Sequence, residues 1–130
     1  MNHKGTETQS DELSRAVLGC AIEVHRELGP GLLESAYEAC LVWEIEQAGL
    51  ACQRQLSLPV HYKGQSLDVG YRVDLVVEDR LILELRTVDT ILPVHEAQLL
   101  TYMKLTGFST GLILNFKTAL LRDGIKRMVL

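Results

Sequence analysis

Within residues 70–86, two acidic residues stand inside apolar stretches rather than in the polar turn between them. Asp74 and Glu84 each lie among aliphatic residues, in two stretches with the composition of β-strands that a polar turn connects. A buried carboxylate without a partner costs several kcal/mol, or its pKa rises until the group is neutral. The fold must therefore supply a partner for these acids, and one candidate is a bound divalent cation.

The length of the turn decides whether the two acids share a face of the sheet. A two-residue turn at residues 79–80 would pair Leu75 with Glu84 and place Asp74 on the opposite face. A three-residue loop, over residues 79–81 or 78–80, or a β-bulge, would bring Asp74 onto the face of Glu84. A joint role for the two acids requires one of these longer connections.

Hydrophobic periodicity predicts the other elements. Apolar residues at helical spacing predict helices over residues 11–28, 32–48 and 93–107. Alternating or continuous apolar residues predict strands over residues 53–62, 65–78, 81–87, 110–116 and 124–130.

The second predicted helix carries an acid in its first turn, Glu34. The helix dipole favours an acid there by about 0.3–1 kcal/mol, which is a sufficient structural reason for it. The core-facing residues expected on this helix are Leu33, Tyr37, Cys40, Leu41 and Ala48.

Composition limits the class of protein. The chain has 130 residues, of which 47% are hydrophobic, enough for one core, so we expect a flexible leader over residues 1–10 and a single domain over residues 11–130. No apolar run reaches the ~20 residues of a membrane span, and we expect a soluble, cytoplasmic protein. The three cysteines show neither metal-ligand nor redox spacing. The net charge of −4 argues against a broad basic surface for nucleic acid, although not against a nuclease whose acids bind metal.

Three motifs in this order resemble the PD-(D/E)XK nuclease superfamily. They are Asp74, then Glu84-Leu85-Arg86, then Gln98 and Tyr102 four residues apart on the third predicted helix. The resemblance covers most of the chain after Asp11. More narrowly, residues 31–37 (Gly-Leu-Leu-Glu-Ser-Ala-Tyr) and 92–102 are similar to the small GxxExxY proteins of that superfamily.

The resemblance implies a restriction-endonuclease-like α/β core, in which helices flank a central mixed sheet of four to five strands. It also implies a Mg2+ or Mn2+ site formed by Glu34, Asp74, Glu84 and the backbone carbonyl of Leu85. These are hard oxygen ligands of the kind that such ions prefer. The implied activity is metal-dependent hydrolysis of nucleic-acid phosphodiesters, as an endo- or exonuclease.

Other residues would support the site. By the same resemblance, Gln98 and Tyr102 orient the substrate or hold the site together. Tyr37 is expected to pack in the core and to bond a site carboxylate through its hydroxyl. A second cation could come from Arg72, two residues before Asp74 on the same strand face, or from Lys104 on the third predicted helix.

The sequence departs from the superfamily pattern at Arg86, where a lysine is usual. Arginine keeps the positive charge but does not lose its proton, and its planar fork reaches acceptors differently. A catalytic role in stabilising negative charge therefore survives, whereas a role as a base does not.

Two other interpretations remain open. The acids can form a salt-bridge network with Arg72 and Arg86 in a catalytically degenerate nuclease fold that binds nucleic acid or protein. Alternatively, the chain is a homo-oligomer that uses Trp43 and the edge strand at residues 53–62.

Overall fold

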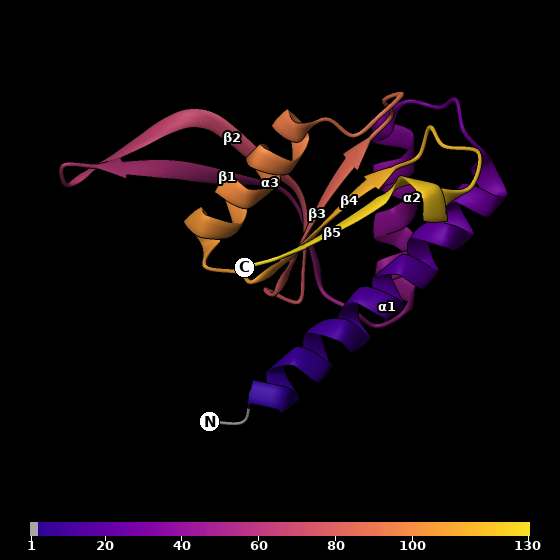
Figure 1. The fold of residues 1–130 in the computed structure, drawn as a ribbon, viewed down its shortest axis with the longest axis horizontal. Helices are drawn as coiled ribbons and strands as arrows, with labels where there is room; N and C mark the ends of the chain where they lie inside the picture. Colours follow the sequence, from indigo (N-terminus) through magenta and orange to yellow (C-terminus); the bar gives the residue numbers. More distant parts are fainter. Residues whose placement is uncertain (1–2) are drawn as a thin grey trace.

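The computed structural model describes the backbone of residues 3–130 and the side chains of residues 11–130. Along the chain, its helices and strands are α1 (His3–Leu28), α2 (Glu34–Gln47), β1 (Cys52–Tyr62), β2 (Gln65–Val77), β3 (Leu81–Arg86), α3 (Pro93–Thr106), β4 (Thr110–Asn115), the short 3-10 helix η1 (Leu121–Gly124) and β5 (Ile125–Val129). Their order confirms the predicted α/β class (Figure 1).

The five strands lie side by side in the order in which they occur along the chain. β3 and β4 run parallel, and the other neighbouring strands run antiparallel, so the sheet is mixed as expected. The parallel pair requires a crossover connection, and α3 provides it.

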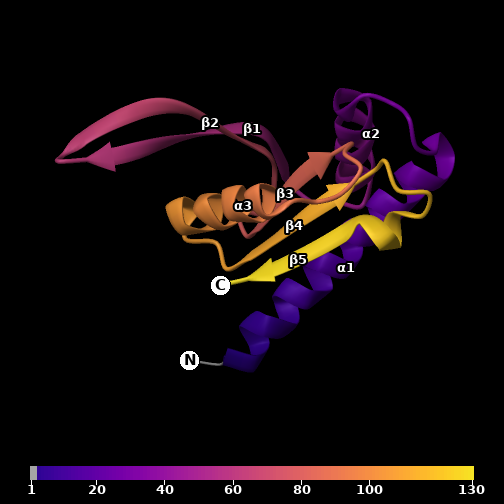
Figure 2. The same ribbon diagram turned by 45° about the horizontal axis from the view of Figure 1, so that its top comes forward.

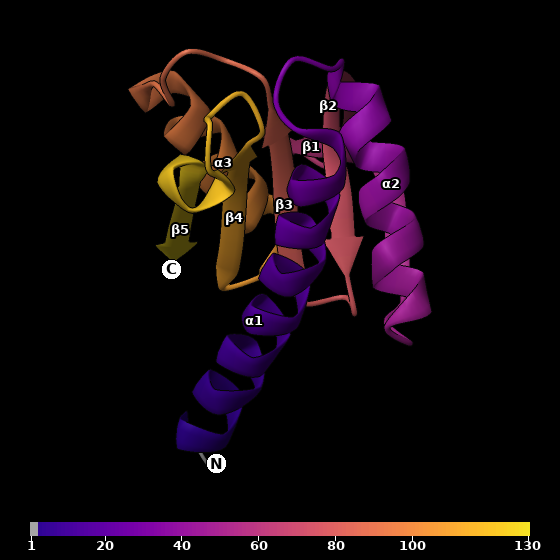
Figure 3. The same ribbon diagram turned by 90° about the vertical axis from the view of Figure 1, so that its right-hand side faces the viewer.

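Helices cover both faces of the sheet (Figure 3). α1 and α2 pack on one face, where the larger core includes Leu41, Leu83 and Phe116. α3 packs on the other face, where Leu99 and Met103 contact a second core. Aliphatic residues of β3 point alternately into the two cores, as the period of a strand requires.

A long two-stranded ribbon projects from this body (Figures 1 and 2). It forms because β2 pairs with β3 only through Leu75, Val76 and Val77, whereas its pairing with β1 continues to the turn at Lys63 and Gly64. The root of the ribbon therefore lies at the point where β3 carries Glu84.

The connection between β2 and β3 is the three-residue loop over residues 78–80, because Val77 pairs with Leu81 and Leu75 with Leu83. Glu78 and Asp79 adopt left-handed backbone conformations in it, with φ of 53° and 50°. The requirement for a loop of this length, which places Asp74 and Glu84 on one face, is confirmed.

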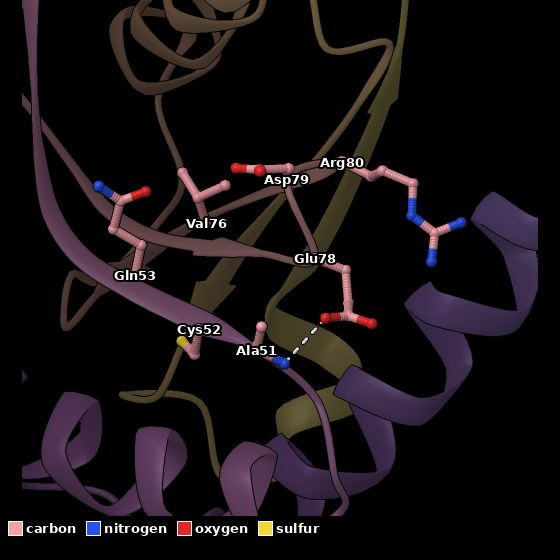
Figure 4. Close-up of a pocket in the computed structure, with 7 residues that line it drawn as sticks. All are labelled: Ala51, Cys52, Gln53, Val76, Glu78, Asp79 and Arg80. Carbon is pink, nitrogen blue, oxygen red and sulfur yellow. Dashed lines mark hydrogen bonds between the residues drawn. The ribbon is translucent and has the colours of Figure 1, made fainter.

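Glu78 also fastens this loop to the start of β1. Its backbone N–H donates to the carbonyl oxygen of Ala51 at 2.9 Å, and its carboxylate accepts from the N–H of Ala51 at 2.9 Å. Figure 4 shows the second of these bonds at the edge of a 410 Å³ hollow, which Asp79 and Arg80 also line. The two bonds hold the loop that fixes the register of the hairpin.

Two expectations about the helices are corrected. α1 begins at His3 rather than Asp11, since no proline interrupts the intervening segment; of the predicted leader, residues 1–2 lie outside the described residues. Cys40 of α2, and Leu33 and Ala48 at its two ends, are exposed rather than in the core.

The buried stripe of α2 follows a different register. Its members are spaced one, three or four residues apart, as one face of an α-helix requires: Tyr37, Glu38, Leu41, Val42 and Ile45. The stripe includes an acid, Glu38, that the sequence analysis did not place in the site.

All three cysteines lie among the described residues and are free, and Cys40 is exposed. No helix of residues 3–130 is both long enough and apolar enough to cross a membrane.

Candidate functional site

Asp74 and Glu84 meet at the root of the ribbon, one residue beyond the pairing of Leu75 with Leu83. The backbone N–H of Asp74 donates to Glu84 Oε1 at 3.3 Å, and the backbone N–H of Leu85 donates to Asp74 Oδ2 at 2.9 Å. Each carboxylate thus accepts a bond from the backbone of the other strand. The two acids thereby hold the strands together.

The guanidinium of Arg86 lies between the two acids. Its Nη1 donates to Asp74 Oδ2 at 3.2 Å and to the backbone carbonyl of Leu85 at 2.7 Å. Its Nη2 donates to Glu84 Oε2 at 3.1 Å and to Gln98 Oε1 at 2.6 Å. The planar fork therefore contacts both carboxylates and one backbone carbonyl, which a single cation holds together.

The site is largely removed from solvent. The side chain of Glu84 is 3% exposed, that of Arg86 16% and that of Asp74 20%. Burial raises the pKa of Glu84 to about 8 from its ordinary value of 4.5; the charge of Asp74 adds to the increase, and Arg86 opposes it. The single guanidinium does not fully compensate two ionised carboxylates at this depth.

α3 contributes the two polar side chains that its spacing predicts. Gln98 accepts the bond from Arg86, and Tyr102 is 3% exposed with its ring edge-on to Tyr71, at 5.7 Å between centroids. Burial is the main cause of the raised pKa of Tyr102, and the negative charge of Glu84 is the next. Gln98 therefore joins the site directly, and Tyr102 lies within reach of its charges.

Arg72 does not join the two acids. Its guanidinium donates to Ser57 Oγ at 2.7 Å and lies 3.9 Å from Asp68 Oδ1, farther along the ribbon. The alternative in which both arginines pair with the site acids is therefore wrong for Arg72 and right for Arg86.

The two residues predicted from the start of α2 have separate environments. Glu34 is exposed in the first turn of the helix. Tyr37 is fully buried and stacked on Phe116, with 4.5 Å between ring centroids, so its predicted role in packing is confirmed. Its hydroxyl donates to the carbonyl of Gly29 at 2.6 Å and accepts from the N–H of Leu32 at 3.1 Å. The prediction that it bonds a site carboxylate is wrong, since the hydroxyl holds the loop between α1 and α2.

Three residues that the sequence analysis missed form a link from α2 to the site: Glu38 and Gln55 make the link, and Arg54 holds Glu38 in place. The side-chain amide of Gln55 donates to Glu38 Oε1 at 2.7 Å and to Asp74 Oδ1 at 3.4 Å. Arg54 donates to Glu38 Oε2 through Nη2 at 3.0 Å and Nε at 3.3 Å. The apolar residues of α2 are distributed around the helix, so their spacing gave no signal that Glu38 lies in the buried stripe.

The pairing of β1 with β2 explains why Gln55 escaped notice. The turn at Lys63 and Gly64 pairs Tyr62 with Gln65, and this register, continued inward, would place Gln53 opposite Asp74. An irregularity between Leu58 and Val60 shifts the register, so that Arg54 pairs with Leu75 and Leu56 with Val73. The residue opposite Asp74 is thus Gln55.

The donor atoms of the site fit a hard divalent cation in chemical type. Two carboxylates and the backbone carbonyl of Leu85 surround one positive group, and all three are oxygen donors. Among side chains 11–130, no three His, Cys, Asp or Glu residues are grouped closely enough to hold a metal ion. The set therefore consists of two acids and a backbone carbonyl, with Arg86 at its centre.

A family model of the PD-(D/E)XK nuclease superfamily matches residues 11–128, which include all the residues of this site. No curated protein and no solved structure matches the chain.

Proposed function

Because the chain belongs to the PD-(D/E)XK nuclease superfamily, we propose that it hydrolyses nucleic-acid phosphodiesters with the help of Mg2+ or Mn2+. Within the superfamily, residues 31–37 support a place among the GxxExxY proteins. The observation that carries the proposal is that Asp74, Glu84 and the carbonyl of Leu85 all contact one positively charged group, the guanidinium of Arg86.

These three residues would hold the metal ion. A divalent ion bound there would polarise a phosphate and lower the pKa of an attacking water. Carboxylate and carbonyl oxygens are suited to Mg2+ or Mn2+ rather than to a metal that prefers thiolate ligands.

The other residues act on the substrate. An arginine side chain does not act as a base, so Arg86 stabilises negative charge on the phosphate but does not take a proton from water. Gln98 and Tyr102, on the helix above the acids, orient the substrate through an amide and a phenol.

The test is a cleavage assay on single-stranded and double-stranded DNA and RNA, with and without Mg2+ or Mn2+. We expect cleavage that requires the metal and is lost in Asp74→Ala, whereas Arg72→Ala, which removes a cation outside the site, leaves metal dependence intact. Cleavage that is equal in the native protein and Asp74→Ala would contradict the proposal.

A second function is favoured by a specific observation, the four hydrogen bonds of Arg86 to Asp74, Leu85, Glu84 and Gln98. A guanidinium held by four hydrogen bonds can occupy the place of the metal ion permanently. The protein would then be a nuclease fold without catalytic activity that binds nucleic acid or protein. Arg86→Lys separates the two functions, because lysine is a point charge without the planar fork. A gain of metal-dependent cleavage in this variant, over an inactive native protein, would support the second function.

A further inference from the structure

Gln55 has an unusual backbone for a strand residue. It lies within β1 and has φ of 51°, in the left-handed region that residues with a side chain seldom occupy. The ladder pairs on either side of it, Arg54 with Leu75 and Leu56 with Val73, are regular. The distortion is therefore confined to the residue that lies opposite Asp74.

The side chain of Gln55 bridges two acids from different elements. One amide donates to Glu38 of α2 at 2.7 Å and to Asp74 of β2 at 3.4 Å. Glu38 is itself 9% exposed and is fixed by the two bonds from Arg54. Gln55 thus has a firm anchor on one side and a longer, adjustable contact on the other.

The contact matters because of how the oxygens of Asp74 are used. Oδ2 accepts from the N–H of Leu85 and from Arg86, so its position is set by β3. Among the hydrogen bonds of side chains 11–130, the bond from Gln55 is the one that reaches Oδ1. Gln55 therefore limits the rotation of the Asp74 carboxylate about its Cβ–Cγ bond.

From this arrangement we propose that Gln55 is a positioning residue for Asp74 and that Glu38 is its anchor. Residues held in sparsely populated backbone conformations gather at functional sites, where the surrounding structure offsets their strain. The left-handed backbone directs the amide to both acids at once. The consequence for cation binding rests on the proposed function, whereas the orientation of Asp74 does not.

The orientation is tested on the metal-free protein by NMR of glutamine side-chain amides. We expect the Gln55 amide resonance to differ from that of an unbonded glutamine and to shift toward it in both Asp74→Ala and Glu38→Leu. The amide of Gln53, an exposed glutamine on the same strand, is the internal control and stays in place. A Gln55 resonance that is unaffected by both variants would overturn the proposal.

The role in cation binding is tested with Gln55→Gly and Gln55→Leu, with Gln53→Leu as the matched control. Both variants lose the bond to Glu38, but glycine accepts the left-handed backbone without strain, so Gln55→Gly should have a higher unfolding midpoint than Gln55→Leu. Both Gln55 variants should weaken Mn2+ binding, measured by calorimetry, by about tenfold or more, as is typical for residues that orient a ligand. A positioning role thus predicts that the two variants differ in stability and share the loss of Mn2+ affinity.

The outcomes separate the two proposals. Unchanged Mn2+ affinity in both Gln55 variants, or a loss of affinity in Gln55→Leu alone, would overturn the role of Gln55 in cation binding. If the native protein takes up no Mn2+ at millimolar concentration, the proposed function fails, and the NMR experiment still decides whether Gln55 positions Asp74.

Discussion

Arg86 is the residue on which the electrostatics of the site depend. It shares one positive charge between two carboxylates that the sheet brings together, and Glu84 is the more deeply buried of the two. Burial and the neighbouring Asp74 together outweigh the attraction to Arg86, so the pKa of Glu84 is raised to about 8. Near neutral pH the Glu84 carboxyl therefore favours its protonated form, and a bound divalent cation would displace that proton.

This shift makes the stability of the protein depend on pH. The folded state binds the Glu84 proton more tightly than the unfolded state, whose pKa is near 4.5. The resulting stabilisation is fully present below pH 4.5 and is lost as the pH rises to about 8. We expect this group to lower the free energy of unfolding by up to about 1.4 kcal/mol per pH unit within that window.

Glu84→Gln tests the origin of this dependence, since glutamine mimics the protonated acid and does not titrate. Urea denaturation at several pH values should show that the variant gains stability relative to the native protein as the pH rises from 5 to 8. Parallel stability profiles for the two proteins would show that Glu84 titrates normally.

Among the connecting elements, the loop between β2 and β3 determines whether the site forms, because its length sets the register. Asp79 has φ of 50° there and an exposed side chain. Asp79→Gly should therefore stabilise the protein by roughly 0.5–1 kcal/mol through relief of the left-handed backbone.

Arg80→Gly is the matched control for that change, as Arg80 is also exposed and is not among the residues with positive φ. It should lose stability, because glycine adds only freedom to the unfolded chain. Chemical denaturation measures both variants, and a loss of stability in Asp79→Gly equal to that in Arg80→Gly would argue against strain in this loop.

The packing of α3 on β4 positions Gln98 above the acids. A Cβ atom on Gly111 of β4 would lie 2.6 Å from Cδ1 of Leu99, the fully buried neighbour of Gln98. Gly111→Ala should therefore cost about 1–3 kcal/mol through overpacking.

The same contact predicts coupling between the two positions. Leu99→Ala makes room for the added methyl group, so the double variant should lose less stability than the sum of the single variants. Strict additivity in a double-mutant cycle, measured by chemical denaturation, would show that Gly111 is not needed for the close contact of Leu99 with β4.

The sequence predicted most of these elements because their hydrophobic periods are clear. Strict alternation over residues 65–78 identified β2, and the mixed sheet followed from the family resemblance. α2 was the exception in detail: its apolar residues are distributed around the helix, so the buried stripe with Glu38 could not be assigned from spacing. Gln55 could not be predicted for a different reason. A local shift in strand register between Leu58 and Val60 determines which residue lies opposite Asp74.

At the scale of the whole molecule, the site occupies the junction of three parts: the root of the β1–β2 ribbon, the end of β3 and the covering helix α3 (Figures 1 and 2). The net charge of −4 offers a nucleic acid little general attraction. Binding of a phosphate backbone therefore has to depend on local positive charge, and a divalent cation held by Asp74 and Glu84 would add it where cleavage is proposed.

Calorimetric titration of Mn2+ into the native protein and into Asp74→Ala tests this account most directly. We predict that the native protein binds Mn2+ at millimolar concentration or below with release of protons, since Glu84 must ionise, and that Asp74→Ala does not bind it. The absence of Mn2+ binding by the native protein, or equal binding by Asp74→Ala, would contradict the assignment of this site to a divalent cation.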